Sequence, residues 1–109
     1  MARLQQGAVI WADLPPPIGR RPVVILTRDR AIGKLSSLTV GPLTRTIRNL
    51  QTEVVLQPDD GVRTICAVNL DNITTTPRAR LGKVITVLNP RKLLLVFTAI
   101  RIAFDMPSN

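Results

Sequence analysis

Two adjacent arginines, Arg20 and Arg21, stand directly before Pro22 and a run of aliphatic residues at 23–26. The run is apolar on both faces, which predicts a central strand that is buried on both sides. Proline is tolerated at the start of a strand, because the first residue need not donate to the ladder. Such a strand would hold a guanidinium rigidly at its beginning, where it could bind an anion such as a phosphate. The alternative is that both arginines are solvated charges at a strand end.

Hydroxyl groups and arginines alternate in a second segment, residues 43–48. Thr44 could donate a hydrogen bond to a phosphate held by Arg21, although threonine is also simply a favoured strand residue. Arg45 and Arg48 follow closely. We expect them to extend a track of phosphate contacts, with a solvated surface as the alternative.

A third group of polar residues, Asn69, Asp71 and Asn72, lies at the end of a predicted strand. Side chains two apart in a strand share a side, so Asn69 and Asp71 are expected on one face. A guanidinium keeps its proton at neutral pH, which makes Asp71 the more plausible proton acceptor, with Asn69 or Asn72 as hydrogen-bonding neighbours. The alternative for Asp71 is a strand-end carboxylate paired with an arginine.

The sequence has no histidine and a single cysteine, Cys66. This inventory excludes a zinc site of ordinary ligands, histidine-based acid–base catalysis and every Ser-His or Cys-His mechanism. We expect neither a metal nor any other cofactor. Cys66 lies among apolar neighbours and is expected to be a small buried hydrophobe, and a lone cysteine agrees with a reducing compartment.

The charge of the chain indicates a polyanionic partner. Fifteen basic residues, twelve of them arginine, stand against seven acidic ones and give a formal net charge of +8. Arginine binds phosphate through two hydrogen bonds and stacks on bases, so nucleic acid is the first expectation. Three aromatic residues are too few for a platform that stacks successive bases. Trp11 is expected in the core or in a dimer contact, with contact to a base as the alternative.

Neither a membrane span nor a secretion signal is expected. No apolar run approaches the roughly 20 residues of a spanning helix. Residues 1–6 lack the apolar region of a signal peptide. The expected compartment is therefore the cytoplasm, with no membrane partner.

The elements that must position these residues are mostly short strands. They are predicted at residues 7–14, 21–27, 37–42, 52–57, 64–71 and 83–88. The connections are a stiff proline-rich loop at 15–19, a charged segment at 28–34, an Asp-Gly turn at 58–61 and a turn or helical loop at 77–80. Asn89 and Pro90 begin a helix that runs to about Phe104, since apolar residues recur there every three or four positions. We expect one domain, residues 1–109, in which a small twisted barrel or rolled sheet packs against this helix.

Five segments line up in order and spacing: residues 7–14, 19–26, 42–47, 53–56 and 70–73. Together they resemble the MazF/PemK family of toxins from bacterial toxin–antitoxin pairs, over about residues 7–103. The resemblance implies a mainly β fold with a C-terminal helix, a small twisted barrel of the CcdB-type, Src-homology-three-like kind, assembled as a homodimer. It also implies a metal-independent endoribonuclease that cuts single-stranded RNA at short sequences and is silenced by a cognate antitoxin.

The family's functional residues fall on particular positions of this chain. Its catalytic arginine, which directly precedes a proline, falls on Arg21, and its catalytic threonine falls on Thr44. An acidic residue implicated in some members falls on Asp71. The RNA-binding residues that we expect around them are Arg20, Arg45, Arg48, Asn69 and Asn72. Two departures bear on base recognition and proton transfer. The loop at 15–19 is shorter than in relatives that carry an acidic or glutamine-bearing insertion, and the histidine proposed as catalytic in some members is absent.

The predicted reaction uses the 2′-OH of the RNA as nucleophile and leaves a 2′,3′-cyclic phosphate and a 5′-hydroxyl on messenger, ribosomal or transfer RNA. The alternative is a non-catalytic small-barrel toxin or binding module that acts on nucleic acid or on a topoisomerase, the latter known for the CcdB architecture. The match at both Arg21 and Thr44 favours the nuclease, because a binding module has no need of both.

Overall fold

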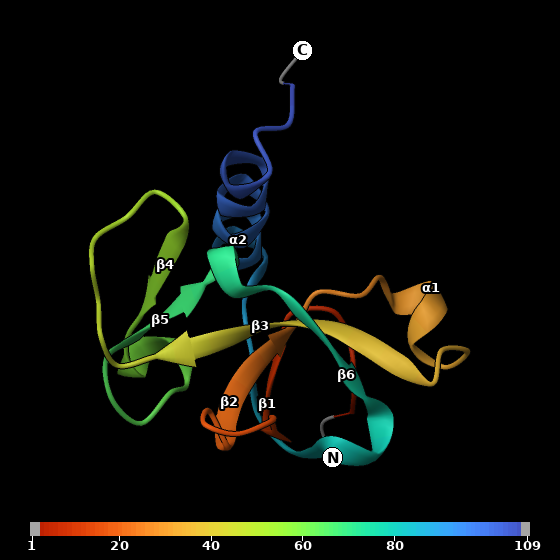
Figure 1. Cartoon of the computed structure of the whole chain (residues 1–109). Helices are drawn as coiled ribbons and strands as arrows, with labels where there is room; N and C mark the ends of the chain where they lie inside the picture. The colour runs from red at the N-terminus through yellow and green to blue at the C-terminus, as the bar shows by residue number, and fades with distance from the viewer. Residues whose placement is uncertain (1–2, 108–109) are drawn as a thin grey trace.

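The computed structural model describes residues 3–107, which form one rolled antiparallel sheet with a helix standing against it (Figure 1). Its strands are β1 (Ala8–Asp13), β2 (Arg20–Ile25), β3 (Ser37–Thr44), β4 (Glu53–Leu56), β5 (Cys66–Asn69), β6 (Thr74–Pro77) and β7 (Leu81–Val87). The helices are α1 (Asp29–Ile32) and α2 (Pro90–Ala103), with 3-10 turns η1 (Pro58–Asp60), η2 (Leu70–Asn72) and η3 (Arg78–Arg80). The strand order is β4-β5-β3-β2-β1-β7, with β6 paired to β3. Within the described residues no ladder joins β4 to β7, so the barrel is rolled but open.

Strand β2 is buried on both faces, as its apolar run predicts. Val23, Val24 and Ile25 are fully buried. Val24 belongs to the core cluster beneath α2, whereas Val23 and Ile25 belong to a second cluster on the opposite face of the sheet. Successive side chains of a strand point to opposite faces, and here each face meets its own core. Packing from both sides fixes the strand that begins with Arg20 and Arg21.

Strand β3 connects the two halves of the sheet and ends at Thr44. Its residues 37–40 pair with β6, and Leu43 and Thr44 pair with β5. On the other edge β3 pairs with β2, and that ladder stops at the pair formed by Val23 and Pro42. Because β2 and β3 are no longer joined beyond this pair, the residues that flank it on both strands line an opening.

Helix α2 begins and ends where the sequence predicts. Asn89 caps it, since its Oδ1 accepts a hydrogen bond from the backbone N–H of Lys92 at 2.8 Å. Val96 and Ala99 face the sheet and are buried, while Leu94 on the opposite side is exposed. In the described part of the chain, no helix is long and apolar enough to cross a membrane.

The structure differs from the predicted elements at the end of β5 and at β6. The predicted strand at 64–71 begins at Cys66 and ends at Asn69, and Asp71 lies in the turn η2. Asn69 Oδ1 accepts the backbone N–H of Asp71 at 3.0 Å, so the asparagine caps a turn instead of continuing the strand. The prediction that Asn69 and Asp71 share a strand face is therefore wrong. Strand β6 was not predicted, because three threonines and a proline show no apolar alternation.

The connections show smaller differences. The charged segment at 28–34 contains the short helix α1, and the third strand extends two residues further than predicted, to Thr44. The predicted turn or helical loop at 77–80 is η3, and the Asp-Gly turn at 58–61 takes the form of η1 followed by Gly61 in a left-handed conformation. These differences lengthen or shorten elements and leave their order unchanged.

Candidate active site

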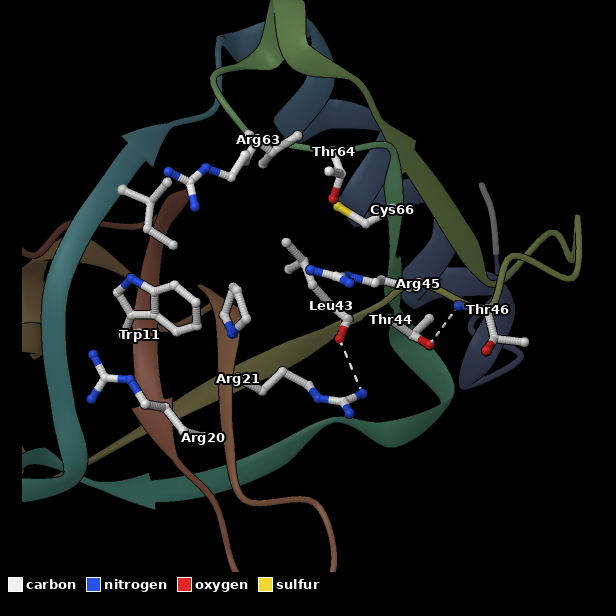
Figure 2. A pocket seen from close by; sticks show the side chains of 13 residues that line it. Trp11, Arg20, Arg21, Leu43, Thr44, Arg45, Thr46, Arg63, Thr64 and Cys66 are labelled. Carbon is white, nitrogen blue, oxygen red and sulfur yellow. Dashed lines mark hydrogen bonds between the residues drawn. The ribbon is translucent and has the colours of Figure 1, made fainter.

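A hollow opens between the β1–β2 hairpin, the end of β3 and the segment that leads from η1 into β5 (Figure 2). This main pocket has a volume of about 770 Å³. It is lined by Trp11, Arg20, Arg21, Pro22, Leu43, Thr44, Arg45, Thr46, Val62, Arg63, Thr64, Cys66 and Ile85. Four of these residues are arginines and none is an aspartate or a glutamate. The pocket therefore presents positive charge alone, which suits a polyanion.

Arg21 is held at the edge of the pocket by the backbone of the next strand. Its side chain is half-buried, and Nη1 donates a hydrogen bond to the carbonyl oxygen of Leu43 at 3.3 Å. The single ion pair within residues 3–107 joins Lys92 to Asp60, so no carboxylate there neutralises Arg21. One N–H group positions the guanidinium, and the remaining donors are left for a ligand.

Thr44 is the last residue of β3 and is also half-buried. Its Oγ1 accepts a hydrogen bond from the backbone N–H of Thr46 at 3.1 Å. Because the oxygen acts as acceptor in this contact, the hydroxyl proton remains available to a ligand. Figure 2 shows the Thr44 hydroxyl and the Arg21 guanidinium on the same side of the pocket, with Arg45 reaching inwards beside them.

Arg20 and Trp11 form the opposite wall of the main pocket. The guanidinium carbon of Arg20 lies 5.0 Å from the centre of the Trp11 ring, in a cation–π contact. Arg20 itself is exposed, whereas Trp11 is half-buried. The expectation that Trp11 lies in the core is not met, because its side chain faces the pocket.

The other four predicted site residues lie outside the lining of the main pocket. Asp71 accepts a hydrogen bond from the hydroxyl of Thr52 at 2.6 Å, and Asn69 caps the turn that contains Asp71. Asn72 is exposed at the end of the same turn. Arg48 lies four residues beyond β3, where its backbone N–H binds the carboxylate of Glu53 at 2.9 Å. The structure thus places Arg20, Arg21, Thr44 and Arg45 in the lining of the main pocket, and Asp71 is not part of that lining.

Sequence reasoning missed the lining residues on the far side of the pocket, above all Arg63 and Thr64. They follow Gly61, which has a positive φ of 97° and packs against Thr86 of β7. The turn itself was visible as an Asp-Gly pair, but its direction depends on contacts with a strand more than twenty residues later. An arginine next to a predicted turn was the one feature that could have suggested Arg63.

Cys66 is buried, as the sequence predicts, although it borders the pocket. Burial raises the pKa of its thiol, the positive charge of Arg45 lowers it and Asp60 raises it, with a net upward shift. The thiol is therefore neutral at physiological pH and is a poor nucleophile. Residues 3–107 contain no cluster of three or more histidine, cysteine, aspartate or glutamate side chains arranged to hold a metal ion.

A family model described as "PemK-like, MazF-like toxin of type II toxin-antitoxin system" matches residues 5–104. The chain belongs to this family. The match extends over nearly the same residues as the five segments that carry the resemblance in the sequence, and it confirms that assignment together with the fold class.

Two curated relatives from Mycobacterium tuberculosis are similar over most of the chain. "Probable endoribonuclease MazF5" is 41% identical over 105 residues, which cover 92% of each chain. "Probable endoribonuclease MazF2" is 42% identical over 91 residues, covering 83% of this chain and 87% of the relative.

Solved structures of MazF-type proteins have the same fold. The toxin MazF-mt6 of Mycobacterium tuberculosis is 35% identical and covers 93% of this chain with a TM-score of 0.86, and 99% of its own chain is matched. A mycobacterial endoribonuclease in complex with its cognate antitoxin is 26% identical, with a TM-score of 0.87 over 98% of this chain and 100% of its own.

Proposed function

We propose that this MazF-like toxin is a metal-independent, sequence-selective endoribonuclease that cuts single-stranded RNA. The curated relatives carry endoribonuclease names, and the identity of 41% over 92% of both chains supports the same activity here. The main pocket is the observation that supports this proposal most, because four arginines and the Thr44 hydroxyl line it and no acidic side chain does. Such a pocket suits an RNA backbone that is bound through several neighbouring phosphates.

The reaction that these groups can promote begins with the 2′-OH of the substrate. The 2′-oxygen forms a bond to phosphorus, the bond from phosphorus to the 5′-oxygen breaks, and a proton passes from the first oxygen to the solvent and from the solvent to the second. Arg21 would bind two non-bridging oxygens of the phosphate and stabilise the charge that grows on them. Thr44 would donate its hydroxyl proton to the same phosphate. Removing one preorganised donor of this kind typically costs about 3–4 kcal/mol in the transition state.

The position of Asp71 does not support its predicted role as proton acceptor. Its carboxylate is bound by the Thr52 hydroxyl at 2.6 Å and is not among the groups that line the pocket. With no carboxylate in the lining, water is the acceptor that we propose for the proton of the 2′-OH. Asp71→Asn should therefore leave the single-turnover rate nearly unchanged, whereas a loss comparable to that of Thr44→Ala would restore Asp71 as the base.

A cognate antitoxin is the partner that we propose for this toxin. One of the solved structures contains an endoribonuclease with its cognate antitoxin. The net charge of +8 and the four arginines of the main pocket would attract an acidic segment, which could fold over the pocket as it binds. The proposed substrate is cellular RNA, so the proposal places the activity in the cytoplasm.

The proposal can be tested by incubating the purified protein with a mixed RNA pool in EDTA and mapping the ends. We expect 2′,3′-cyclic phosphate and 5′-hydroxyl ends at one short sequence. The same RNA with hydrogen in place of the 2′-OH at the cut position should remain intact, and Arg21→Ala should be inactive in parallel.

Two results would contradict the proposal. Cleavage that is lost in EDTA and restored by magnesium would show a metal-dependent reaction. Tight RNA binding by the folded protein without any cleavage would favour a non-catalytic binding module.

A further inference from the structure

A second, smaller hollow adjoins the main pocket. This side pocket has a volume of about 50 Å³ and is lined by Trp11, Ala12, Asp13, Arg20, Ala79, Arg80, Leu81 and Gly82. Trp11 and Arg20 are the two residues that line both hollows. The partition between the two hollows is therefore an indole ring covered by a guanidinium.

The pairing of β1 with β2 explains how the partition is built. Trp11 lies opposite Pro22, and Asp13 lies opposite Arg20. Since residues two apart share a strand face, Trp11 and Asp13 project from the same side of the hairpin. The cross-strand neighbours Asp13 and Arg20 form no ion pair in the described structure, and the Arg20 guanidinium instead lies over the ring of Trp11, 5.0 Å from its centre.

The contact between Arg20 and Trp11 is weak enough for a bound RNA to replace it. Arg20 is exposed, and a cation–π contact at an exposed site is weak. A nucleobase stacks on an aromatic ring more strongly, and each base has a face that can do so. An RNA strand that enters the main pocket would also supply phosphates, and these bind a guanidinium better than an indole does.

We propose that Trp11 is the base-stacking residue of this site and that Arg20 covers it only in the free protein. When single-stranded RNA binds, a base stacks on the indole and Arg20 moves to the backbone phosphate beside that base. The strand then passes over the partition, and the edge of the adjacent base meets Asp13 in the side pocket. This inference rests on the proposed function, because it assigns base recognition to the same site.

The side pocket limits which base edge it accepts. At about 50 Å³ it admits the edge of a base and not a whole nucleotide. The Asp13 carboxylate is an acceptor only, so it favours an edge with an amino group, as in cytosine, over the carbonyl edge of uracil. Asp13 thus becomes a specificity-determining residue next to the stacked base.

The chain contains a single tryptophan, so its fluorescence reports on Trp11 alone. The probe is a short RNA that contains the cleavage sequence, with a 2′-deoxy nucleotide at the cut position so that it binds without being cut. Anisotropy of a dye on this RNA measures binding, and tryptophan emission measures stacking in the same titration. We expect saturable quenching whose midpoint coincides with that of the anisotropy.

A matched series of RNAs, each with one abasic position, locates the stacked base without altering the protein. At one position the abasic RNA should still bind, with an affinity reduced about 5- to 100-fold, and the quenching should be lost. On the protein side, Trp11→Phe should keep the cleavage sequence and Trp11→Leu should relax it at that position. Asp13→Asn should change the base preference at the adjacent position and leave the stacked position unaltered.

The possible failures are distinguishable. Binding seen by anisotropy with unchanged tryptophan emission would overturn the role of Trp11 and leave the proposed function standing. Equal quenching by every abasic RNA would also overturn the stacking role of Trp11. The change in tryptophan emission would then be explained by movement of Arg20 away from the ring alone. Absence of RNA binding would overturn both the inference and the proposed function.

Discussion

Cys66 offers a test of the environment of the main pocket at the scale of one residue. The thiol is 7% exposed and burial raises its pKa, so both the accessible fraction and the thiolate fraction are reduced. Alkylation by iodoacetamide at about pH 8 should be much slower in the native protein than in denaturant. The pH midpoint of native labelling should lie above that of an unfolded peptide containing the same residue.

The linked effect on stability has a definite sign. The Cys66 thiol has a higher pKa in the folded protein than in the unfolded chain. Above the pKa of the unfolded thiol, the unfolded chain loses this proton while the folded protein keeps it. Rising pH therefore shifts the folding equilibrium towards the unfolded chain. The free energy of unfolding should fall as pH rises through the ordinary cysteine range, and the Cys66→Ala variant should lack that part of the decline. Native labelling as fast as that of the unfolded chain would contradict the buried, neutral thiol.

Single residues of the site were predictable where they belong to strand ends. Arg21 and Thr44 lie near the start of β2 and at the end of β3. The aliphatic run at 23–26 indicates β2, whereas the predicted third strand stops at Pro42, two residues before Thr44. Asp71 was misplaced because Asn69 caps a turn, a local hydrogen bond that competes with strand extension. Trp11 lines the pocket and is not a core residue. The apolar character of an indole does not show whether its ring meets another strand or a cavity.

A substitution at Gly61 tests the conformation of the turn that follows η1 and leads to the rim of the main pocket. Its φ is 97°, and a Cβ added there would collide with the side chain of Thr86 on β7. Gly61→Ala should therefore lower stability by about 1–3 kcal/mol, because a strained conformation and a clash act together. Thermal unfolding measures the loss.

Gly33 provides the matched control for this change. It ends α1 with an ordinary φ of −76°, and nothing lies within 4 Å of an added Cβ. Gly33→Ala should leave the melting temperature unchanged or slightly raised, by reducing the entropy of the unfolded chain. Equal effects of the two substitutions would contradict the described conformation of the turn.

The strands and α2 were largely predictable because their signals are local. The aliphatic run of β2 and the three- and four-residue spacing of α2 identify those elements in the sequence itself. Strand β6 has no such signal, since its threonines pair along the free half of β3 and only Thr76 is buried. Strand β6 forms because residues 37–40 of β3 have unpaired backbone groups along one edge. That edge comes from the tertiary fold, so the local sequence of β6 does not reveal it.

At the scale of the whole molecule, the exposed apolar side of α2 supports the expected homodimer. Leu94, Leu95 and Phe104 are 64%, 48% and 60% exposed. A contribution of Trp11 to the dimer contact stays a prediction. Sedimentation at micromolar concentration should show a species of twice the monomer mass of 12.0 kDa.

Two lysine substitutions can distinguish a specific effect on the dimer interface from a general effect of adding surface charge. Leu94→Lys should weaken the dimer about tenfold or more, since it buries a charge at the interface. Leu35→Lys changes an equally apolar and 44% exposed residue just after α1, and it should leave the dimer intact. A wild-type protein that sediments only as a monomer would contradict the expectation.

The net charge of +8 favours an acidic partner. The antitoxin is expected to cross the main pocket with an acidic segment, so saturating antitoxin should block binding of an uncleavable RNA oligonucleotide. The affinity of the antitoxin should fall with salt concentration, and less steeply for Arg63→Ala, which removes one charge from the rim. A fully neutralised toxin that still binds the oligonucleotide in the pocket would show that occlusion is the wrong model.

A role of Arg21 in the transition state can be separated from a role in binding by measuring rate and affinity on the same variants. Single-turnover cleavage at saturating RNA and equilibrium binding of the 2′-deoxy-blocked RNA are measured for the wild type, Arg21→Ala, Arg21→Lys and Arg48→Ala. An interaction made in the transition state lowers turnover, whereas a uniform contact lowers affinity alone. Arg48 lies outside the pocket lining and serves as the control.

We predict that Arg21→Ala loses about 10²- to 10³-fold in rate while its affinity changes little, and that Arg21→Lys fails as well, because an ammonium cannot bind two phosphate oxygens in a planar fork. Arg48→Ala should keep the wild-type rate once RNA is saturating. If Arg21→Ala also cleaves at the wild-type rate under saturating RNA, Arg21 is a docking residue and the reaction takes place elsewhere.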